Sequence, residues 1–346
     1  MNQWDTLTQY ARDVGQYDLQ LECYWKNQDW VSLAQQLPPH EPMPSDPSQT
    51  KIYEIYMALQ EGRLQDADKL CSEAFNYALK SWCLLPDVTV QAYVPLMQTF
   101  HQLVELHESA LLLDEVNKSI RHNSVPDLKN TITAWRERLP NKWDDITVWY
   151  ELLTWRNCVF KMLMDSNQSF QPDIKQALQQ LGTQQETWTL LKLSEAARKQ
   201  SLPMVCINTL QRFQHMHQSD TQHQFIRLRE EALCRLEMGT TQEMTIGLNT
   251  INKVNFDPPG QHGFSTANRA ELLRIKGELL QRIPDSRSPH LTRVQEANDV
   301  LTTSCGTDER SGKAWVAWGN VLHQQLLNSE AKGGNSQAEI DKRTEY

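Results

Sequence analysis

Residues 141–160 read NKWDDITVWYELLTWRNCVF and contain neither glycine nor proline. Three tryptophans, Trp143, Trp149 and Trp155, follow one another at intervals of six residues. A six-residue step turns a helix through about 240°, so these side chains cannot share one stripe. A helix that is apolar on every side is a buried helix. We therefore predict an inner helix that contacts a hairpin partner and a neighbouring repeat, with Trp149, Leu153 and Trp155 in the core.

The start of this helix carries its own signals. Asp144 is of a residue type that favours the N-cap position. Trp143, directly before it, is placed to pack on Val148 as a hydrophobic staple. We expect the helix to begin at residue 144 with both interactions formed.

Helical periodicity recurs along almost the whole chain, and no run of alternating β-branched residues indicates a strand. A polar junction around Gln185 separates two of the expected helices. The expected helical ranges are 4–14, 17–26, 30–36, 50–61, 64–82, 88–113, 125–138, 144–164, 173–181, 186–200, 202–217, 221–238, 242–252, 265–281, 290–303 and 310–327.

The connections between these helices are short, which favours helical hairpins stacked in a row. ALQEGRLQDADKLCSEAF, from Ala58, has a glycine and then small residues at the spacing of a tetratricopeptide repeat. Segments from Ala196 and Cys234 follow the same order of helix, tight turn and helix, with less regular small residues. We expect an all-α, irregular tetratricopeptide-like solenoid over residues 1–328 and a disordered polar tail or linker over 329–346.

The composition limits the class of protein. With 34 basic and 43 acidic residues, the net charge of -9 disfavours phosphate backbones, so we expect no direct nucleic-acid partner. No run of 18 apolar residues and no signal peptide is present, which predicts no membrane partner and a cytosolic or nuclear location. The seven cysteines are scattered and include no C-x-x-C pair, which indicates reduced thiols and gives no support to a zinc site.

The sequence lacks the loops and motifs of common enzymes, including phosphate-binding glycine loops, kinase catalytic loops and the G-x-S-x-G turn. One cluster, His215, His217, Asp220 and His223, resembles a metal site only at first sight. His215 and His217 diverge by about 200° on a helix, so a solvated helix end is favoured over a metal site. We expect no catalytic residue, no cofactor and no metal.

One mixed patch suits an interaction with another protein. TAWRERLPNKW, residues 133–143, places Arg136, Arg138 and Lys142 between Trp135 and Trp143 across a turn marked by proline. Basic charge beside exposed aromatic surface would suit an acidic, amphipathic activation segment that folds on binding. The alternative is an ordinary turn whose tryptophans pack into the core.

Several segments resemble a known family in the same order along the chain. The 141–160 stretch is similar to part of the FAT domain of the transformation/transcription domain-associated proteins, the pseudokinase branch of the PI3-kinase-related kinases. QYDLQLECYWKNQDWVSLAQQL at 16–37, LSEAARKQSLPMVCINTL at 193–210 and GKAWVAWGNVLHQQ at 312–325 agree with other parts of that domain. By this resemblance, Trp315 and Trp318 belong to a repeat start and are expected in the core.

The resemblance implies a non-enzymatic scaffold in the nucleus that regulates transcription as a coactivator. Its implied partners are subunits of histone acetyltransferase complexes of the SAGA and MYST type, together with acidic transcription activators. Family members also carry HEAT repeats before this domain and a pseudokinase after it, so a fragment, a split gene product and a divergent remnant are all alternatives for this chain.

Two other functions stay open from the sequence. The chain could be the regulatory FAT segment of an active PI3-kinase-related protein kinase, which the downstream reading frame would decide. An unrecognised helical enzyme would need polar residues that converge in one apolar pocket.

Overall fold

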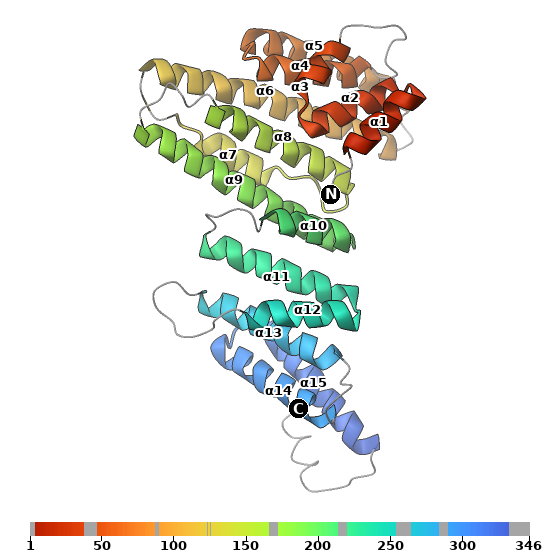
Figure 1. Cartoon of the computed structure of the whole chain (residues 1–346), viewed down its shortest axis with the longest axis vertical. Helices are drawn as coiled ribbons and strands as arrows, with labels where there is room; N and C mark the ends of the chain where they lie inside the picture. Colours follow the sequence, from red (N-terminus) through yellow and green to blue (C-terminus); the bar gives the residue numbers. More distant parts are fainter. Residues whose placement is uncertain are drawn as a thin grey trace. The chain divides into compact units, whose positions relative to one another are not determined.

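The protein is all α-helical, as the sequence predicted. The structure, a computed structural model, describes residues 4–37, 47–86, 90–122, 124, 126–165, 172–213, 220–253, 264–283 and 290–331. Within these ranges it contains fifteen α-helices, one 3-10 helix (Val90–Ala92) and no strand (Figure 1). The α-helices are α1 (Trp4–Val14), α2 (Tyr17–Asn27), α3 (Trp30–Gln36), α4 (Pro47–Gln60), α5 (Leu64–Cys83), α6 (Tyr93–His122), α7 (Lys129–Glu137), α8 (Ile146–Asp165), α9 (Pro172–Lys199), α10 (Pro203–Phe213), α11 (Thr221–Met238), α12 (Thr241–Asn252), α13 (Thr266–Arg282), α14 (His290–Thr307) and α15 (Gly312–Ala331).

The chain forms two compact units. Unit 1 comprises Met1–Glu186 and unit 2 comprises Thr187–Tyr346. The first part of α9 belongs to unit 1 and the rest to unit 2. Each unit has its own core and is described by itself.

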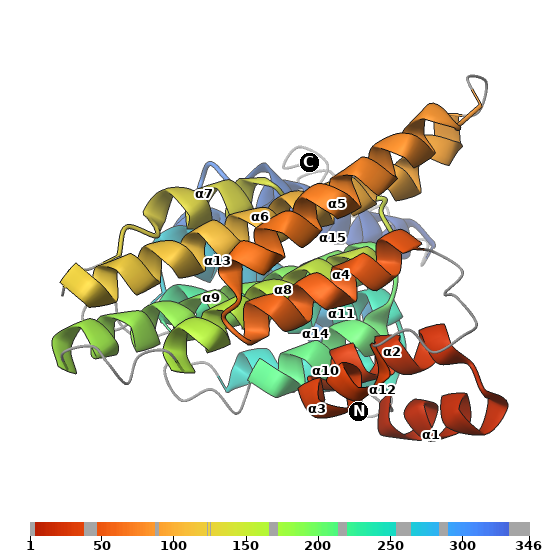
Figure 2. The ribbon, with the colours of Figure 1, turned by 90° about the horizontal axis from the view of Figure 1, so that it is seen from above.

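Helical hairpins build unit 1, in which α1 packs on α2, α4 on α5 and α5 on α6. Figures 1 and 2 show α4 and α5 side by side. Gly62 turns the chain between them with a positive φ of 74°, which glycine adopts without the steric cost of a side chain. Ala67, Cys71 and Ala74 of α5 are buried, and such small residues let two helices approach closely. This hairpin therefore has the turn and the small-residue spacing that were read from the sequence.

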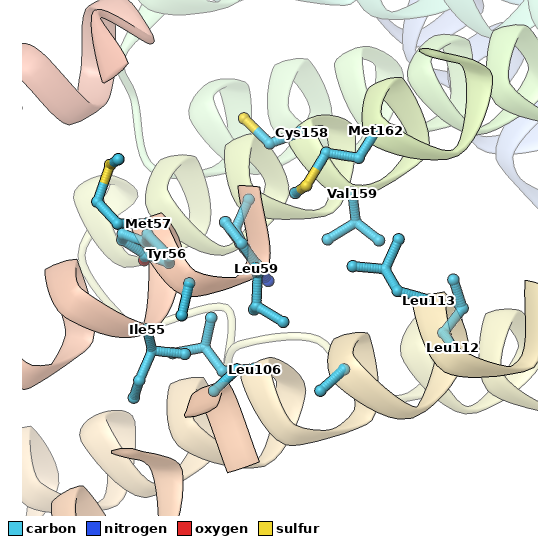
Figure 3. Packing of buried hydrophobic residues seen from close by; sticks show 14 of the residues in the cluster. Ile55, Tyr56, Met57, Leu59, Leu106, Leu112, Leu113, Cys158, Val159 and Met162 are labelled. Atoms are coloured by element: carbon cyan, nitrogen blue, oxygen red, sulfur yellow. The ribbon is translucent and has the colours of Figure 1, made fainter. Parts of the chain in front are cut away.

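A continuous apolar core occupies the centre of unit 1. Figure 3 shows side chains from α4, α6 and α8 that point toward one another, including Leu59, Leu106 and Val159. Aromatic rings extend this core. Tyr56 lies between Trp25 and Trp155, with ring centroids 4.4 Å apart on each side.

Unit 2 contains smaller apolar clusters between successive helices. One joins α11, α12 and α13 through residues such as Leu236, Ile251 and Ile275. Where α13 crosses α14, Gly277 is required by close packing, because a Cβ there would lie 2.5 Å from Cγ of Leu301. In unit 2 each helix thus packs on its near neighbours along the chain, as in helical-repeat proteins.

Gly182, which falls in the gap between two expected helical ranges, lies inside a helix. The expected ranges 173–181 and 186–200 are wrong, because α9 is continuous across them. Gly182 packs against α8, where a Cβ would lie 2.7 Å from Sδ of Met164. The glycine therefore serves a close approach of two helices. Gln185, expected at a polar junction, is only 4% exposed.

The placement of Trp315 in the core is wrong. Its side chain is 45% exposed and its Nε1 donates to the carbonyl oxygen of Glu309 at 2.9 Å. The core-facing positions of α15 belong instead to Ala314, Ala317 and Val321, which recur at helical spacing. Trp318 is half-buried against this cluster.

The C-terminal boundary differs slightly from the predicted one. Helix α15 ends at Ala331, three residues beyond residue 328. The rest of the predicted tail, residues 332–346, lies outside the described part of the chain.

Candidate protein-interaction site

The five candidate interaction residues lie at the end of α7 and in the segment that leads to α8, all within unit 1. Trp135 is buried and Arg138 is half-buried. Arg136, Lys142 and Trp143 are exposed. The structure therefore divides the predicted patch into an inner pair and an outer group of three.

The inner pair is fixed by one carboxylate of α6. Arg138 donates from Nη1 and Nη2 to the two oxygens of Glu108, at 2.8 and 2.9 Å. Nε1 of Trp135 donates to Oε2 of the same carboxylate at 2.8 Å. Burial raises the pKa of Glu108, but the hydrogen bonds from Arg138 and Trp135 outweigh burial and lower it overall. Arg138 is thus already neutralised by a forked ion pair of high geometric specificity.

A second, buried ion pair lies beside the first. Arg156 of α8 donates to both oxygens of Glu105, which is fully buried, and its Nη2 also donates to the carbonyl oxygen of Arg138 at 2.8 Å. The guanidinium of Arg156 lies 5.7 Å from the centroid of the Trp135 ring. These contacts tie α6, α7 and α8 together beneath the segment.

Lys142 and Trp143 of the outer group present charge and aromatic surface together. Trp143 is 84% exposed, and Nζ of Lys142 lies 4.7 Å from the centroid of its ring, within the range of a cation–π interaction. Nε of Arg136 donates to Oε1 of Gln185 at 3.2 Å. Partial burial lowers the pKa of Arg136. Arg136, Lys142 and Trp143 are the part of the predicted patch that a partner can reach, and we call them the outer patch.

The start of α8 differs from the prediction, because the helix begins at Ile146 and not at residue 144. Asp145 caps the helix, since its Oδ1 accepts from the amide of Thr147 at 2.8 Å, and this hydrogen bond lowers the pKa of Asp145. Asp144 instead accepts from the amide of Asn141 and from Nε2 of Gln98. The proposed staple is wrong, because Trp143 points to solvent.

The other tryptophans of the 141–160 stretch anchor α8. Trp149 is 8% exposed and its Nε1 donates to the carbonyl oxygen of Asn141 at 3.1 Å. Trp155 and Leu153 are each 1% exposed. Nε1 of Trp155 donates to Oγ of Ser109 at 3.1 Å, so both indoles satisfy their polar atom while burying the ring.

Sequence reasoning missed Glu105 and Glu108, the two acids that hold this site. A signal was available, because both interrupt the apolar stretch LVELHESALLL at 103–113. A buried carboxylate requires a paired cation, and Arg138 and Arg156 fill that role.

The described residues contain no group of three or more His, Cys, Asp or Glu side chains that could hold a metal ion. Of the histidine cluster, His215 and His217 lie outside those residues. No helix in the described ranges combines the length and apolar character needed to cross a membrane.

Comparison with known families identifies the domain. The model of the FAT domain matches residues 17–345. The chain belongs to the FAT domain family. The matched range includes the four segments that carried the resemblance, apart from the first residue of 16–37, and it takes in helices of both units.

Several relatives of this FAT domain chain are named for the complexes or the process to which they belong. It is 30% identical over 346 residues to the SAGA complex/NuA4 acetyltransferase complex subunit TRA1 of Saccharomyces cerevisiae, covering 94% of this chain and 9% of that protein. The Schizosaccharomyces pombe subunit Tra1 is also 30% identical, with coverages of 92% and 9%. The human transformation/transcription domain-associated protein is 26% identical, with coverages of 93% and 9%. The chain spans about a tenth of the length of these relatives.

Proposed function

We propose that the chain is a non-enzymatic scaffold segment of a nuclear transcription coactivator that belongs to histone acetyltransferase complexes. The observation that carries this proposal is the similarity along more than nine-tenths of the chain to proteins named as subunits of the SAGA and NuA4 acetyltransferase complexes. Residues 1–328 act as one helical module that works through protein contacts. Neither direct nucleic-acid binding nor membrane binding is part of this function.

The architecture suits such a role. Stacked helical hairpins expose long surfaces to partners while each hairpin is stabilised by its neighbours. Unit 1 presents large apolar side chains at its surface, such as Leu84 and Trp143, at 85% and 84% exposure. Exposed aromatic and aliphatic anchors of this kind are where binding energy concentrates in protein interfaces.

The scaffold proposal is tested by capturing the protein from its own cells. With a tag on the native gene, acetyltransferase subunits identified by mass spectrometry should copurify in constant ratio. The purified chain itself should transfer no phosphate from ATP to a peptide. Absence of every acetyltransferase subunit would reject the scaffold role and favour a regulatory segment of an active PI3-kinase-related kinase.

Within this function, the outer patch is the proposed contact for an acidic, amphipathic activation segment. Lys142 supplies positive charge beside the ring of Trp143, which supplies an exposed apolar surface, and Arg136 in the last turn of α7 adds a second cation. Long-range attraction by the cations speeds encounter, and the ring provides the buried anchor of the complex. Arg138, which the sequence placed in this contact, is occupied by Glu108 and is assigned a supporting role.

The contact is tested with the double variant Lys142→Ala/Trp143→Ala. We expect its affinity for an acidic activation peptide to fall about ten-fold or more, the effect of losing about 1.4 kcal/mol of binding free energy. The salt dependence should also flatten, because one screened attraction is removed. The matched control is Lys118→Ala/Leu111→Ala, two exposed residues of α6. Equal affinity of the two variants would reject the contact and leave the scaffold proposal untouched.

A further inference from the structure

Two buried cysteines lie on neighbouring helices of unit 2. Cys206 lies on α10 and is fully buried, and Cys234 lies on α11 and is 1% exposed. The two helices pack together. The Cys234 thiol donates from Sγ to the carbonyl oxygen of Pro203, 3.7 Å away in the first turn of α10. The Cys234 sulfur therefore reaches the helix that carries Cys206, within one turn of it.

The two thiols also interact directly. The hydrogen bond between them raises the pKa of Cys206 and lowers that of Cys234. Burial raises both values, and Glu237 raises that of Cys234 further, whereas the guanidinium groups of Arg198 and Arg235 favour the Cys234 thiolate. The thiolate is the reactive form of cysteine. The pair thus combines a nucleophilic sulfur with a second thiol beside it.

Other buried cysteines of the protein lack this combination. Burial raises the pKa of both Cys71 and Cys158 to about 12, and each is a thiol at neutral pH. Cys83 is exposed. Cys71 and Cys158 are therefore references for buried thiols, and Cys83 is a reference for an exposed thiol.

A cavity gives small molecules access to the pair. It has a volume of about 140 Å³ and is lined by Arg198, Ser201, Pro203, Cys234, Glu237 and Met238. A water molecule occupies about 30 Å³ in the liquid, so a peroxide fits in this space. Cys234 lines the cavity and Cys206 does not, which makes Cys234 the first sulfur that an oxidant meets.

We propose that Cys206 and Cys234 are a redox site, in which a peroxide oxidises Cys234 and the pair closes into a disulfide between α10 and α11. The Cys234 thiolate attacks one oxygen of hydrogen peroxide, the O–O bond breaks, and the departing hydroxide takes a proton to become water. This leaves a sulfenic acid on Cys234. The sulfur of Cys206 then attacks the sulfenic sulfur, the S–O bond breaks, and hydroxide leaves with the Cys206 proton as a second water. The two thiols lose two electrons and the peroxide gains them.

The test is to treat the folded full chain with hydrogen peroxide, block remaining thiols, digest with trypsin without reductant and analyse the peptides by mass spectrometry. We expect peptides 200–212 and 230–235 to appear joined by a disulfide that dithiothreitol cleaves. Cys71 and Cys158 should stay reduced. Failure to form this cross-linked peptide while Cys83 becomes oxidised would overturn the proposal.

Two variants separate the steps. In Cys206→Ser the cross-link should vanish and Cys234 should be trapped as a sulfenic acid that dimedone labels, whereas Cys83→Ser should cross-link like the natural chain. Far-UV circular dichroism checks that both variants are folded. Should Cys206→Ser unfold, phenylarsine oxide tests the unmodified chain, since this reagent bridges two adjacent thiols. One equivalent should protect Cys206 and Cys234 together from alkylation, and labelling of both despite the reagent would contradict the site.

Discussion

The two units of this FAT domain chain are stabilised in different ways. Unit 1 buries a stack of large aromatic rings, with Tyr56 between Trp25 and Trp155, inside one continuous apolar core. Unit 2 has smaller apolar clusters, and arginine–glutamate pairs link its helices. Arg198 of α9 pairs with Glu230 of α11 at 2.7 Å, and Arg235 of α11 pairs with Glu243 of α12.

The difference predicts which changes each unit tolerates. Apolar burial contributes stability in proportion to area and depends little on pH or salt. A buried ion pair contributes little net stability, yet the loss of one partner is costly because it strands the other charge. Unit 1 also holds a buried pair, Arg156 with Glu105, but its stack of rings should make it most sensitive to truncation of an aromatic side chain. Unit 2, whose apolar clusters are smaller, should be most sensitive to neutralisation of a carboxylate.

Truncation of Trp155 should have the largest effect. Trp155→Ala removes a ring that is 1% exposed, together with its stacking on Tyr56, and should cost about 3–5 kcal/mol of unfolding free energy. Trp143→Ala, the exposed control, should change it by about 0.5 kcal/mol or less. Urea denaturation measures both, and similar midpoints for the two variants would show that the aromatic stack does not stabilise unit 1.

Neutralisation of Glu230 comes next. Glu230→Gln leaves Arg198 and Arg229 without a fully buried carboxylate and should cost about 3 kcal/mol, at the low end for a broken buried pair because Arg198 keeps Glu237. Glu237→Gln is the control, since Glu237 is about half exposed. In Glu230→Gln, hydrogen exchange should show loss of protection within unit 2. A loss confined to unit 1 would contradict the role of Glu230 in stabilising unit 2.

Acid should weaken unit 2 through Glu195. Burial raises the pKa of Glu195, but the hydrogen bonds from Lys199 and Lys192 outweigh burial and lower it from 4.5 to about 2. Because the folded-state pKa lies below the unfolded one, the stabilisation is complete above pH 4.5 and is lost as the pH falls toward about 2. Glu195→Gln should reduce the slope of stability against pH in this window. Urea midpoints measured across the window test it, and an unchanged slope would exclude Glu195 as the titrating group.

The smallest predicted effect lies at the start of α8. Asp145→Ala removes the observed cap and should cost about 1 kcal/mol, while Asp144→Ala should leave the helix start protected. Hydrogen exchange at the amide of Thr147 distinguishes them. Loss of that protection in Asp144→Ala alone would instead support Asp144 as the N-cap, as the sequence predicted.

The fold could be predicted from the sequence because the signals for its helices and turns are local. The periodicity around Trp149 and the turn at Gly62 each depend on a few neighbouring residues, and the structure has a helix and a hairpin there. Gly182 shows the limit, since only the position of Met164 on another helix explains why a glycine occurs within α9.

The candidate site was harder to predict from the sequence, because the contacts that decide it join residues that are distant in sequence. Arg138 and Lys142 look alike in the segment RERLPNK, but Arg138 pairs with Glu108, thirty residues earlier, and Lys142 lies over Trp143. The buried Gln185 accepts from Arg136 across 49 residues. No local pattern separates a cation that supports the fold from one that is exposed to solvent.

We propose that the folded helical module joins acetyltransferase complexes through protein contacts, and quantitative capture from native cells is the decisive experiment. The tagged full-length protein and its Trp143→Ala variant should both copurify acetyltransferase subunits, because exposed Trp143 does not support the fold. Trp155→Ala, which disrupts the core of unit 1, should capture far fewer of them per molecule. Equal capture by all three proteins would show that assembly does not depend on this module, and no capture by the unaltered protein would contradict the account altogether.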